Sequence, residues 1–175
     1  MHIFLTGDIQ VGKSTIIRQW LAAHPELRAG GFLTVWNGER NSGESSFHLV
    51  SLGGGEALTV NNRVGLRRFH QQGRQVTPYP EVFDAVGVSL LEQARACDVI
   101  VMDEIGFTEN DAAAFHQAVL ACLDGGTPVL GVVRDRPGVL TDKVRAHPNV
   151  RLVRVNTENR EDVLRALLPW NGGDL

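Results

Sequence analysis

The chain has 175 residues, of which 43% are hydrophobic and 21% charged, and its formal net charge is -3. This length suits one compact α/β domain over residues 1–175, and the charge argues against a dedicated nucleic-acid binder.

No apolar run approaches the ~20 residues that span a bilayer, and no signal-type segment precedes the first expected strand, so a cytoplasmic protein is expected. Cys97 and Cys122 lie far apart in the sequence and are expected to be reduced.

The N-terminal half begins with a predicted strand and helix. His2 to Thr6 is a short apolar run that ends at a glycine, and apolar residues recur at helical spacing from Ser14 to Ala23. Residues 31–36 and 46–52 predict the two strands of a β-hairpin with a long polar loop. Residues 56–78 contain four arginines and lack clear periodicity. We expect this segment to be a long loop near a ligand.

The C-terminal half alternates predicted strands and helices. Strands are expected at residues 98–102, 128–133 and 150–155. Helices are expected at residues 82–94, about 110–123, 139–146 and 158–168. This order predicts a mainly parallel sheet with helices on both faces, and the hairpin would add antiparallel strands at one edge.

The segment between the first strand and the first helix matches the phosphate-loop pattern G-x-x-x-x-G-K-[ST]. Its glycines let successive N–H groups point at phosphate oxygens, and the helix N-terminus adds positive potential. Lys13 is expected to reach the β- and γ-phosphates, Ser14 to bind Mg²⁺ and Thr15 to contact the α-phosphate. A chance match is the alternative, and the strand–loop–helix context argues against it. The predicted nucleotide-binding residues here are Gly7, Asp8, Ile9, Gln10, Val11, Gly12, Lys13, Ser14 and Thr15.

Two adjacent carboxylates follow the apolar run at residues 99–102. Ligands of parallel sheets bind at the carboxyl ends of the strands, so Asp103 can face the same crevice as the phosphate loop. We expect Asp103 to hold Mg²⁺ and Glu104 to orient and polarise the attacking water, with Lys13 as the other catalytic residue. Side chains alternate along a strand, so both carboxylates reach one site only if the strand ends near Asp103. Alternatively, Glu104 caps the next segment or pairs with an arginine.

A further cation is expected at the γ-phosphate, because transition-state charge there usually needs one besides lysine and Mg²⁺. For each arginine the alternative is a solvated surface position. The candidates are Arg40, Arg74, Arg134, Arg136 and Arg160.

The loop after the last predicted strand is expected on the ligand side of the sheet. Asn159 and Arg160 are therefore candidates for contacts with the nucleotide base. Alternatively, Thr157 or Asn156 caps the final helix and Arg160 packs on its surface. Trp20 and Trp36 are expected to be core residues. The alternative is a platform on which a base stacks, and it stays open for Trp36 near the hairpin loop.

With these motifs placed, the chain resembles the small P-loop nucleoside-triphosphatases called cancer-related nucleoside triphosphatases, which have bacterial and archaeal relatives. The matching positions are Gly31-Phe32-Leu33-Thr34, then Arg40, Gly43 and Phe47, then Asp103-Glu104-Ile105-Gly106 with Glu109, and finally Asn159-Arg160. The resemblance implies the P-loop NTPase fold and an Mg²⁺-dependent NTPase with broad base tolerance and slow turnover.

The sequence departs from that family at three places. Phe107 stands where a lysine commonly follows Asp-Glu-Ile-Gly, and Asp8-Ile9-Gln10 replaces a proline-rich start of the phosphate loop. The family's Gly-x-Tyr-Val segment before the central helix has no recognisable match around Gly73 to Val76. Hydrolysis of a nucleoside triphosphate, ATP or GTP, is the first hypothesis. The alternatives are a phosphotransferase that acts on a nucleoside or other small molecule, and a regulatory nucleotide-binding module. No membrane or nucleic-acid partner is expected, and a monomer is the default.

Overall fold

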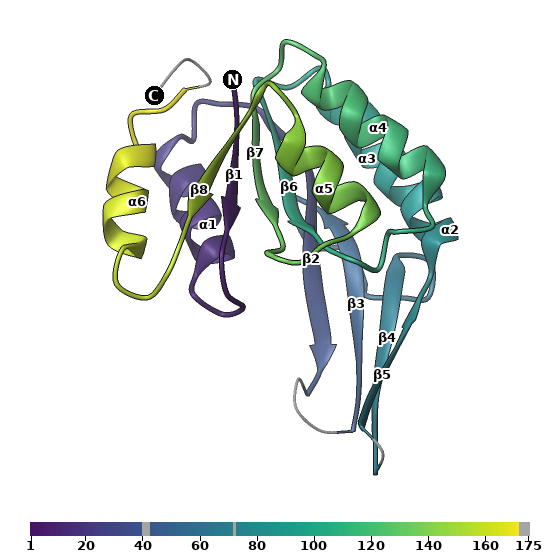
Figure 1. Ribbon diagram of the computed structural model, residues 1–175. Helices are drawn as coiled ribbons and strands as arrows, with labels where there is room; N and C mark the ends of the chain where they lie inside the picture. The colour runs from purple at the N-terminus through teal and green to yellow at the C-terminus, as the bar shows by residue number, and fades with distance from the viewer. Residues whose placement is uncertain (40–42, 72, 172–175) are drawn as a thin grey trace.

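A single mixed sheet with helices on both faces forms the body of the protein, shown as a computed structural model in Figure 1. The structure describes residues 1–39, 43–71 and 73–171. The strands are β1 (His2–Thr6), β2 (Ala29–Gly38), β3 (Glu44–Ser51), β4 (Arg63–His70), β5 (Gly73–Pro78), β6 (Val99–Ile105), β7 (Val129–Val133) and β8 (Val150–Arg154). The helices are α1 (Lys13–Ala23), α2 (Pro80–Val82), the π-helical segment η1 (Phe83–Gly87), α3 (Val88–Ala94), α4 (Ala113–Leu123), α5 (Val139–Ala146) and α6 (Arg160–Leu167).

The strands follow the order β5-β4-β3-β2-β6-β7-β1-β8. Strands β2, β6, β7, β1 and β8 pair in parallel, whereas β3, β4 and β5 continue from β2 in antiparallel pairs. The predicted α/β class, with a mainly parallel core and antiparallel strands at one edge, is confirmed. The carboxyl ends of β1, β6 and β7 all lie at one edge of the sheet, where ligands of parallel sheets bind.

Alternate side chains of β6 enter two cores on opposite faces of the sheet. Val99 and Val101 join the core formed with α1 and α6, whereas Ile100 and Met102 join the core formed with α3, α4 and α5. Burial on both faces explains why this strand is a continuous apolar run in the sequence. Burying one such aliphatic side chain contributes about 1.5–3 kcal/mol, so the end of β6 is firmly anchored.

The long loop predicted at residues 56–78 is wrong over most of its length. Residues 63–70 and 73–78 form β4 and β5, which pair with β3 and with each other. β5 is an exposed edge strand, and Arg67 is a buried cation in the middle of β4. Neither strand therefore shows the apolar alternation that predicts a strand. The two strands form because antiparallel pairing with neighbouring strands satisfies their backbone hydrogen bonds.

The predicted helices are present with changed limits. α4 begins at Ala113 because the preceding residues form a turn, in which the N–H of Ala112 donates to the carbonyl of Glu109 at 2.9 Å. The helix predicted over 82–94 is three consecutive segments, α2, η1 and α3. Cys97 and Cys122 are free thiols, as predicted. Within the described residues, no helix is long and apolar enough to cross a membrane.

Candidate active site

The phosphate loop joins β1 to α1 through glycines with left-handed backbone. The φ angles are 126° at Gly7 and 100° at Gly12, values that glycine adopts readily. The first turn of α1 consists of lysine, serine and threonine, so its N–H groups can meet an anion without a neighbouring carboxylate. Lys13 is only 6% exposed, and its Nζ donates to the carbonyl of Gly7 at 2.9 Å and to that of Asp8. Burial lowers the pKa of Lys13, and a phosphate beside it would favour the charged form.

Alanine at Gly7 is expected to destabilise the protein at the start of this loop. A Cβ there would lie 2.2 Å from the carbonyl oxygen of Val155, and its φ is disfavoured for alanine. We expect Gly7→Ala to lower the free energy of unfolding by at least about 2 kcal/mol in chemical denaturation. Gly126→Ala is the matched control, since a Cβ there would meet no described atom within 4 Å. Equal stability of the two variants would contradict this account of Gly7.

Asp103 lies at the carboxyl end of β6, beside the phosphate loop. Its Oδ1 accepts a hydrogen bond of 2.9 Å from the hydroxyl of Ser14. The residue is 3% exposed, and this burial raises the pKa of Asp103 to about 6, against the opposing effect of the hydrogen bond from Ser14. The two side chains predicted to hold a metal are therefore brought together. A carboxylate and a hydroxyl are oxygen donors of the kind that Mg²⁺ prefers.

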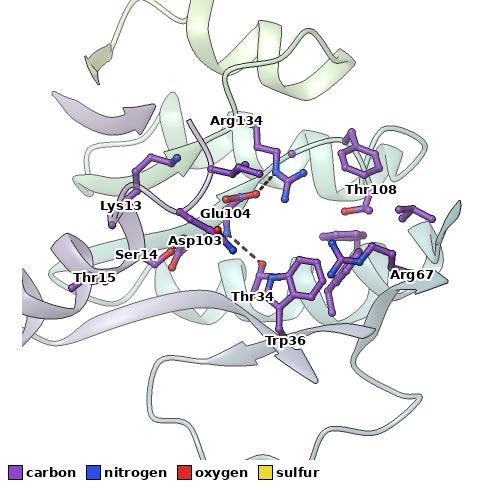
Figure 2. Close-up of a pocket in the computed structure, with 18 of the residues that line it drawn as sticks. Lys13, Ser14, Thr15, Thr34, Trp36, Arg67, Asp103, Glu104, Thr108 and Arg134 are labelled. Atoms are coloured by element: carbon purple, nitrogen blue, oxygen red, sulfur yellow. Dashed lines mark hydrogen bonds and ion pairs between the residues drawn. The ribbon is translucent and has the colours of Figure 1, made fainter. Parts of the chain in front are cut away.

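Glu104 reaches the same cavity as Asp103. β6 ends at Ile105, two residues after Asp103, so the strand ends close to Asp103 as this arrangement requires. The pairing with β7 also shifts register in this stretch, which interrupts the regular alternation of side chains. The carboxylate of Glu104 forms an ion pair with Arg134, and its backbone N–H donates to the hydroxyl of Thr34 at 3.3 Å (Figure 2). Pairing with an arginine, one of the predicted alternatives, is thus observed.

The loop after β6 is held in place by a buried carboxylate. Glu109 is 1% exposed and accepts hydrogen bonds from the N–H of Gly106 and from the hydroxyl of Thr108. Burial raises the pKa of Glu109. These contacts position Phe107 at the cavity, where the guanidinium of Arg134 lies 5.4 Å from the centre of its ring.

A cavity of about 510 Å³ joins these groups. In Figure 2 the side chains of the phosphate loop lie at one end, Arg67 and Thr108 at the other, and Glu104 between them. Of the predicted catalytic, metal and nucleotide-binding residues, the cavity is lined by Ile9, Gln10, Gly12, Lys13, Ser14, Thr15, Asp103 and Glu104. It is also lined by residues outside that set, namely Arg18, Thr34, Trp36, Phe47, Arg67, Arg74, Val76, Phe83, Gly106, Phe107, Thr108 and Arg134.

The expectations for the two tryptophans have different outcomes. Trp20 is fully buried, as predicted. Trp36 is half-buried: it packs against the border of the core and also lines the cavity, so the core prediction holds for it only in part. Its strand projects beyond the helices in Figure 1, which leaves its side chain partly uncovered. A hydrophobic pattern cannot distinguish a covered sheet face from an open one.

The remaining candidates lie outside the cavity lining. The side chain of Asn159 hydrogen-bonds to nearby backbone. Its Oδ1 accepts from the N–H of Asn156 at 2.8 Å, and its Nδ2 donates to the carbonyl of Arg154 at 3.0 Å. Arg160 lies beside the phosphate loop, since a Cβ on Gly12 would be 3.7 Å from its Cδ. Base contacts by these two residues stay a prediction.

Some of the arginine candidates for the γ-phosphate line the cavity, and others do not. Arg134 and Arg74 line the cavity, and Arg134 pairs with Glu104. Arg136 is exposed. Arg40 lies outside the described residues.

The whole chain, and not the phosphate loop alone, matches a known family. A family described as NTPase matches residues 2–168. The chain belongs to this NTPase family. The resemblance drawn from Gly31-Phe32-Leu33-Thr34, Asp103-Glu104-Ile105-Gly106 and Asn159-Arg160 is thereby confirmed.

Named members of this NTPase family match along nearly their full length. The chain is 32% identical over 184 residues to the human cancer-related nucleoside-triphosphatase, covering 93% of this chain and 92% of that protein. It is 28% identical over 171 residues to nucleoside-triphosphatase THEP1 of Thermotoga maritima, covering 96% and 94%.

Two solved structures share the fold. Crystalline THEP1 from Aquifex aeolicus has a TM-score of 0.77 at 24% identity, with 99% of this chain and 100% of that chain covered. The solution structure of a human cancer-related nucleoside triphosphatase has a TM-score of 0.70 at 27% identity, with 96% and 95% covered. The P-loop NTPase fold expected from the strand–loop–helix motif is confirmed.

Proposed function

We propose that this chain is an Mg²⁺-dependent phosphohydrolase that converts a nucleoside triphosphate, ATP or GTP, to the diphosphate and phosphate. The observation that carries the proposal is the cavity in which Lys13, Asp103 and Glu104 meet beside the start of α1. The relatives named nucleoside-triphosphatases support the same reaction.

The residues present fit a magnesium ion. Ser14 and Asp103 offer two oxygen donors held 2.9 Å apart, next to the expected β- and γ-phosphates. Mg²⁺ bound there would neutralise negative charge on these phosphates. Lys13 and the N–H groups of the loop would hold the triphosphate from the other side.

The ion pair between Glu104 and Arg134 suggests how the two residues act in turn. A γ-phosphate entering the cavity would compete for the guanidinium of Arg134, because it carries more negative charge than a carboxylate. Glu104 would then accept a proton from a water molecule whose oxygen attacks the γ-phosphorus, and the bond from that phosphorus to the β,γ-bridging oxygen would break. Arg134 would stabilise the charge that develops on the γ-phosphate.

Phosphate release from ATP and GTP tests this proposal. We expect release by the wild-type chain with Mg²⁺ and its loss when EDTA removes the metal. Lys13→Ala should weaken nucleotide binding by about tenfold to a hundredfold, since it removes charged hydrogen bonds to phosphate. Lys143→Ala, a substitution of an exposed lysine on α5, is the control.

Two results would count against hydrolysis. A wild-type chain that binds nucleotide without releasing phosphate would favour the regulatory module. Release that is unaffected by Lys13→Ala would place the reaction outside this loop.

A further inference from the structure

The cavity extends well beyond the position of the reacting oxygen. In the proposed hydrolase the phosphate loop from Thr15 to Lys13 would hold the α-, β- and γ-phosphates, and Glu104 would lie beside the attacking oxygen. The cavity continues past Glu104 to Trp36, Arg67 and Thr108 (Figure 2). Hydrolysis needs a single water molecule at that end. The rest of this half, which we call the distal half, has room for a second ligand.

One face of the antiparallel strands builds the wall of the distal half. Trp36 of β2 pairs with Phe47 of β3, and Arg67 of β4 pairs with Ser45 of β3 and with Val76 of β5. Residues that pair directly or lie two apart on a strand share a face. Trp36, Phe47, Arg67 and Val76 therefore lie on one face, and all four line the cavity. This wall is mainly aromatic and apolar, which suits a planar ring.

Arg67 places a positive charge in this apolar wall. The residue is 8% exposed, and its guanidinium lies 4.3 Å from the centre of the Trp36 ring and 5.1 Å from that of Phe69. Its Nε donates to the hydroxyl of Ser45 at 3.2 Å. The rings and this hydrogen bond hold the planar guanidinium in one orientation. A guanidinium held in this way suits a carbonyl or carboxylate oxygen on a ligand ring.

We propose that the distal half is an acceptor subsite for an alcohol that carries a planar ring with a carbonyl or carboxylate oxygen. In this second activity, which rests on the proposed hydrolase site, the γ-phosphoryl group passes to the alcohol instead of to water. The hydroxyl oxygen bonds to the γ-phosphorus, the bond from phosphorus to the β,γ-bridging oxygen breaks, and the nucleoside diphosphate leaves. Glu104 takes the hydroxyl proton, and Arg67 binds the ring oxygen.

Transfer of label from ATP to defined alcohols tests this subsite. The full chain is incubated with Mg²⁺, ATP labelled in its γ-phosphate, and either uridine, which has ring carbonyls, or hydroxymethylbenzoate, which has a carboxylate. Adenosine and benzyl alcohol are the matched compounds that lack the ring oxygen. Labelled phosphate ester and free phosphate are measured in the same reaction. We expect ester from uridine or hydroxymethylbenzoate, at about ten times the amount from its matched compound or more.

Measuring both phosphate ester and free phosphate shows whether the acceptor subsite alone is wrong or the proposed hydrolase is wrong as well. Free phosphate without ester from either alcohol would overturn the acceptor subsite and leave the hydrolase standing. Neither product would overturn both. Ester from uridine alone would assign a carbonyl ligand to Arg67, and ester from hydroxymethylbenzoate alone would assign a carboxylate.

The neighbouring residue Arg68 supplies the matched control for Arg67. Arg68 is exposed on the opposite side of β4 and pairs with Glu44 at 2.7 Å. We expect Arg67→Gln to raise the KM for the alcohol about tenfold or more and to lower the ratio of ester to phosphate, whereas Arg68→Gln leaves that ratio unchanged. Because Arg67 is buried, Val76→Ala provides a second variant at a half-buried position on the same wall, and it should lower the same ratio. A wild-type ratio in both Arg67→Gln and Val76→Ala would overturn the proposal.

Discussion

Glu104→Gln is expected to slow phosphate release by about 10²- to 10⁴-fold, the range over which a positioned general base contributes. Glutamine keeps the shape of the side chain but cannot take a proton from water. It also removes the ion pair with Arg134, which leaves that guanidinium available to the γ-phosphate. We therefore expect the affinity for the nucleotide to be at least that of the wild-type chain. Single-turnover phosphate release and equilibrium nucleotide binding measure the two quantities separately.

Glu92→Gln is the control for this variant, because Glu92 is an exposed carboxylate on α3 outside the cavity lining. It should leave both rate and affinity unchanged. If Glu104→Gln released phosphate at the wild-type rate, its carboxylate would serve only to hold Arg134. A variant with lost affinity and an unchanged rate at saturation would instead make Glu104 a binding residue.

Asp103→Asn is expected to stabilise the metal-free and nucleotide-free protein at alkaline pH. Burial raises the pKa of Asp103 from its ordinary 3.8 to about 6. Between these values the folded chain holds a proton that the unfolded chain releases, so this residue's contribution to stability falls as pH rises through that window. The raised pKa corresponds to about 3 kcal/mol lost by pH 8. Asparagine stays neutral and avoids this loss.

Urea unfolding in EDTA at pH 4 and pH 8 measures this effect. The difference in unfolding free energy between Asp103→Asn and the wild-type chain should be small at pH 4 and reach about 3 kcal/mol at pH 8. Taking the difference removes the opposite trend of Asp98, whose pKa is lowered to about 2 by its hydrogen bond from Arg28. Asp111→Asn, at an exposed position, should show no such change. A difference independent of pH would mean that the pKa of Asp103 is the same in the folded and the unfolded chain.

The same variant is expected to lose the dependence of nucleotide binding on Mg²⁺, because it lacks the charged oxygen that is paired with Ser14. A gain in stability with a loss of function is a common trade at active sites.

The sequence alone determined the parts of this protein whose signals are local. Residues 2–15 specify a buried strand, a phosphate loop and a helix start, because glycine spacing and apolar burial act over a few neighbouring positions. The run that ends in Asp103 and Glu104 is likewise readable, since a strand buried on both faces is apolar throughout. Together these segments predicted the parallel core and one end of the cavity.

Only the tertiary structure decided the other end. β4 and β5 form because β3 supplies their hydrogen-bond partners, and their polar sequence gave no alternation to detect. Arg67 becomes a buried cavity residue through packing against Trp36, which lies at the border between the core and the cavity. The pairing of Glu104 with Arg134 joins the ends of two strands about thirty positions apart in the chain. Such contacts depend on register and sheet order, which no single segment encodes.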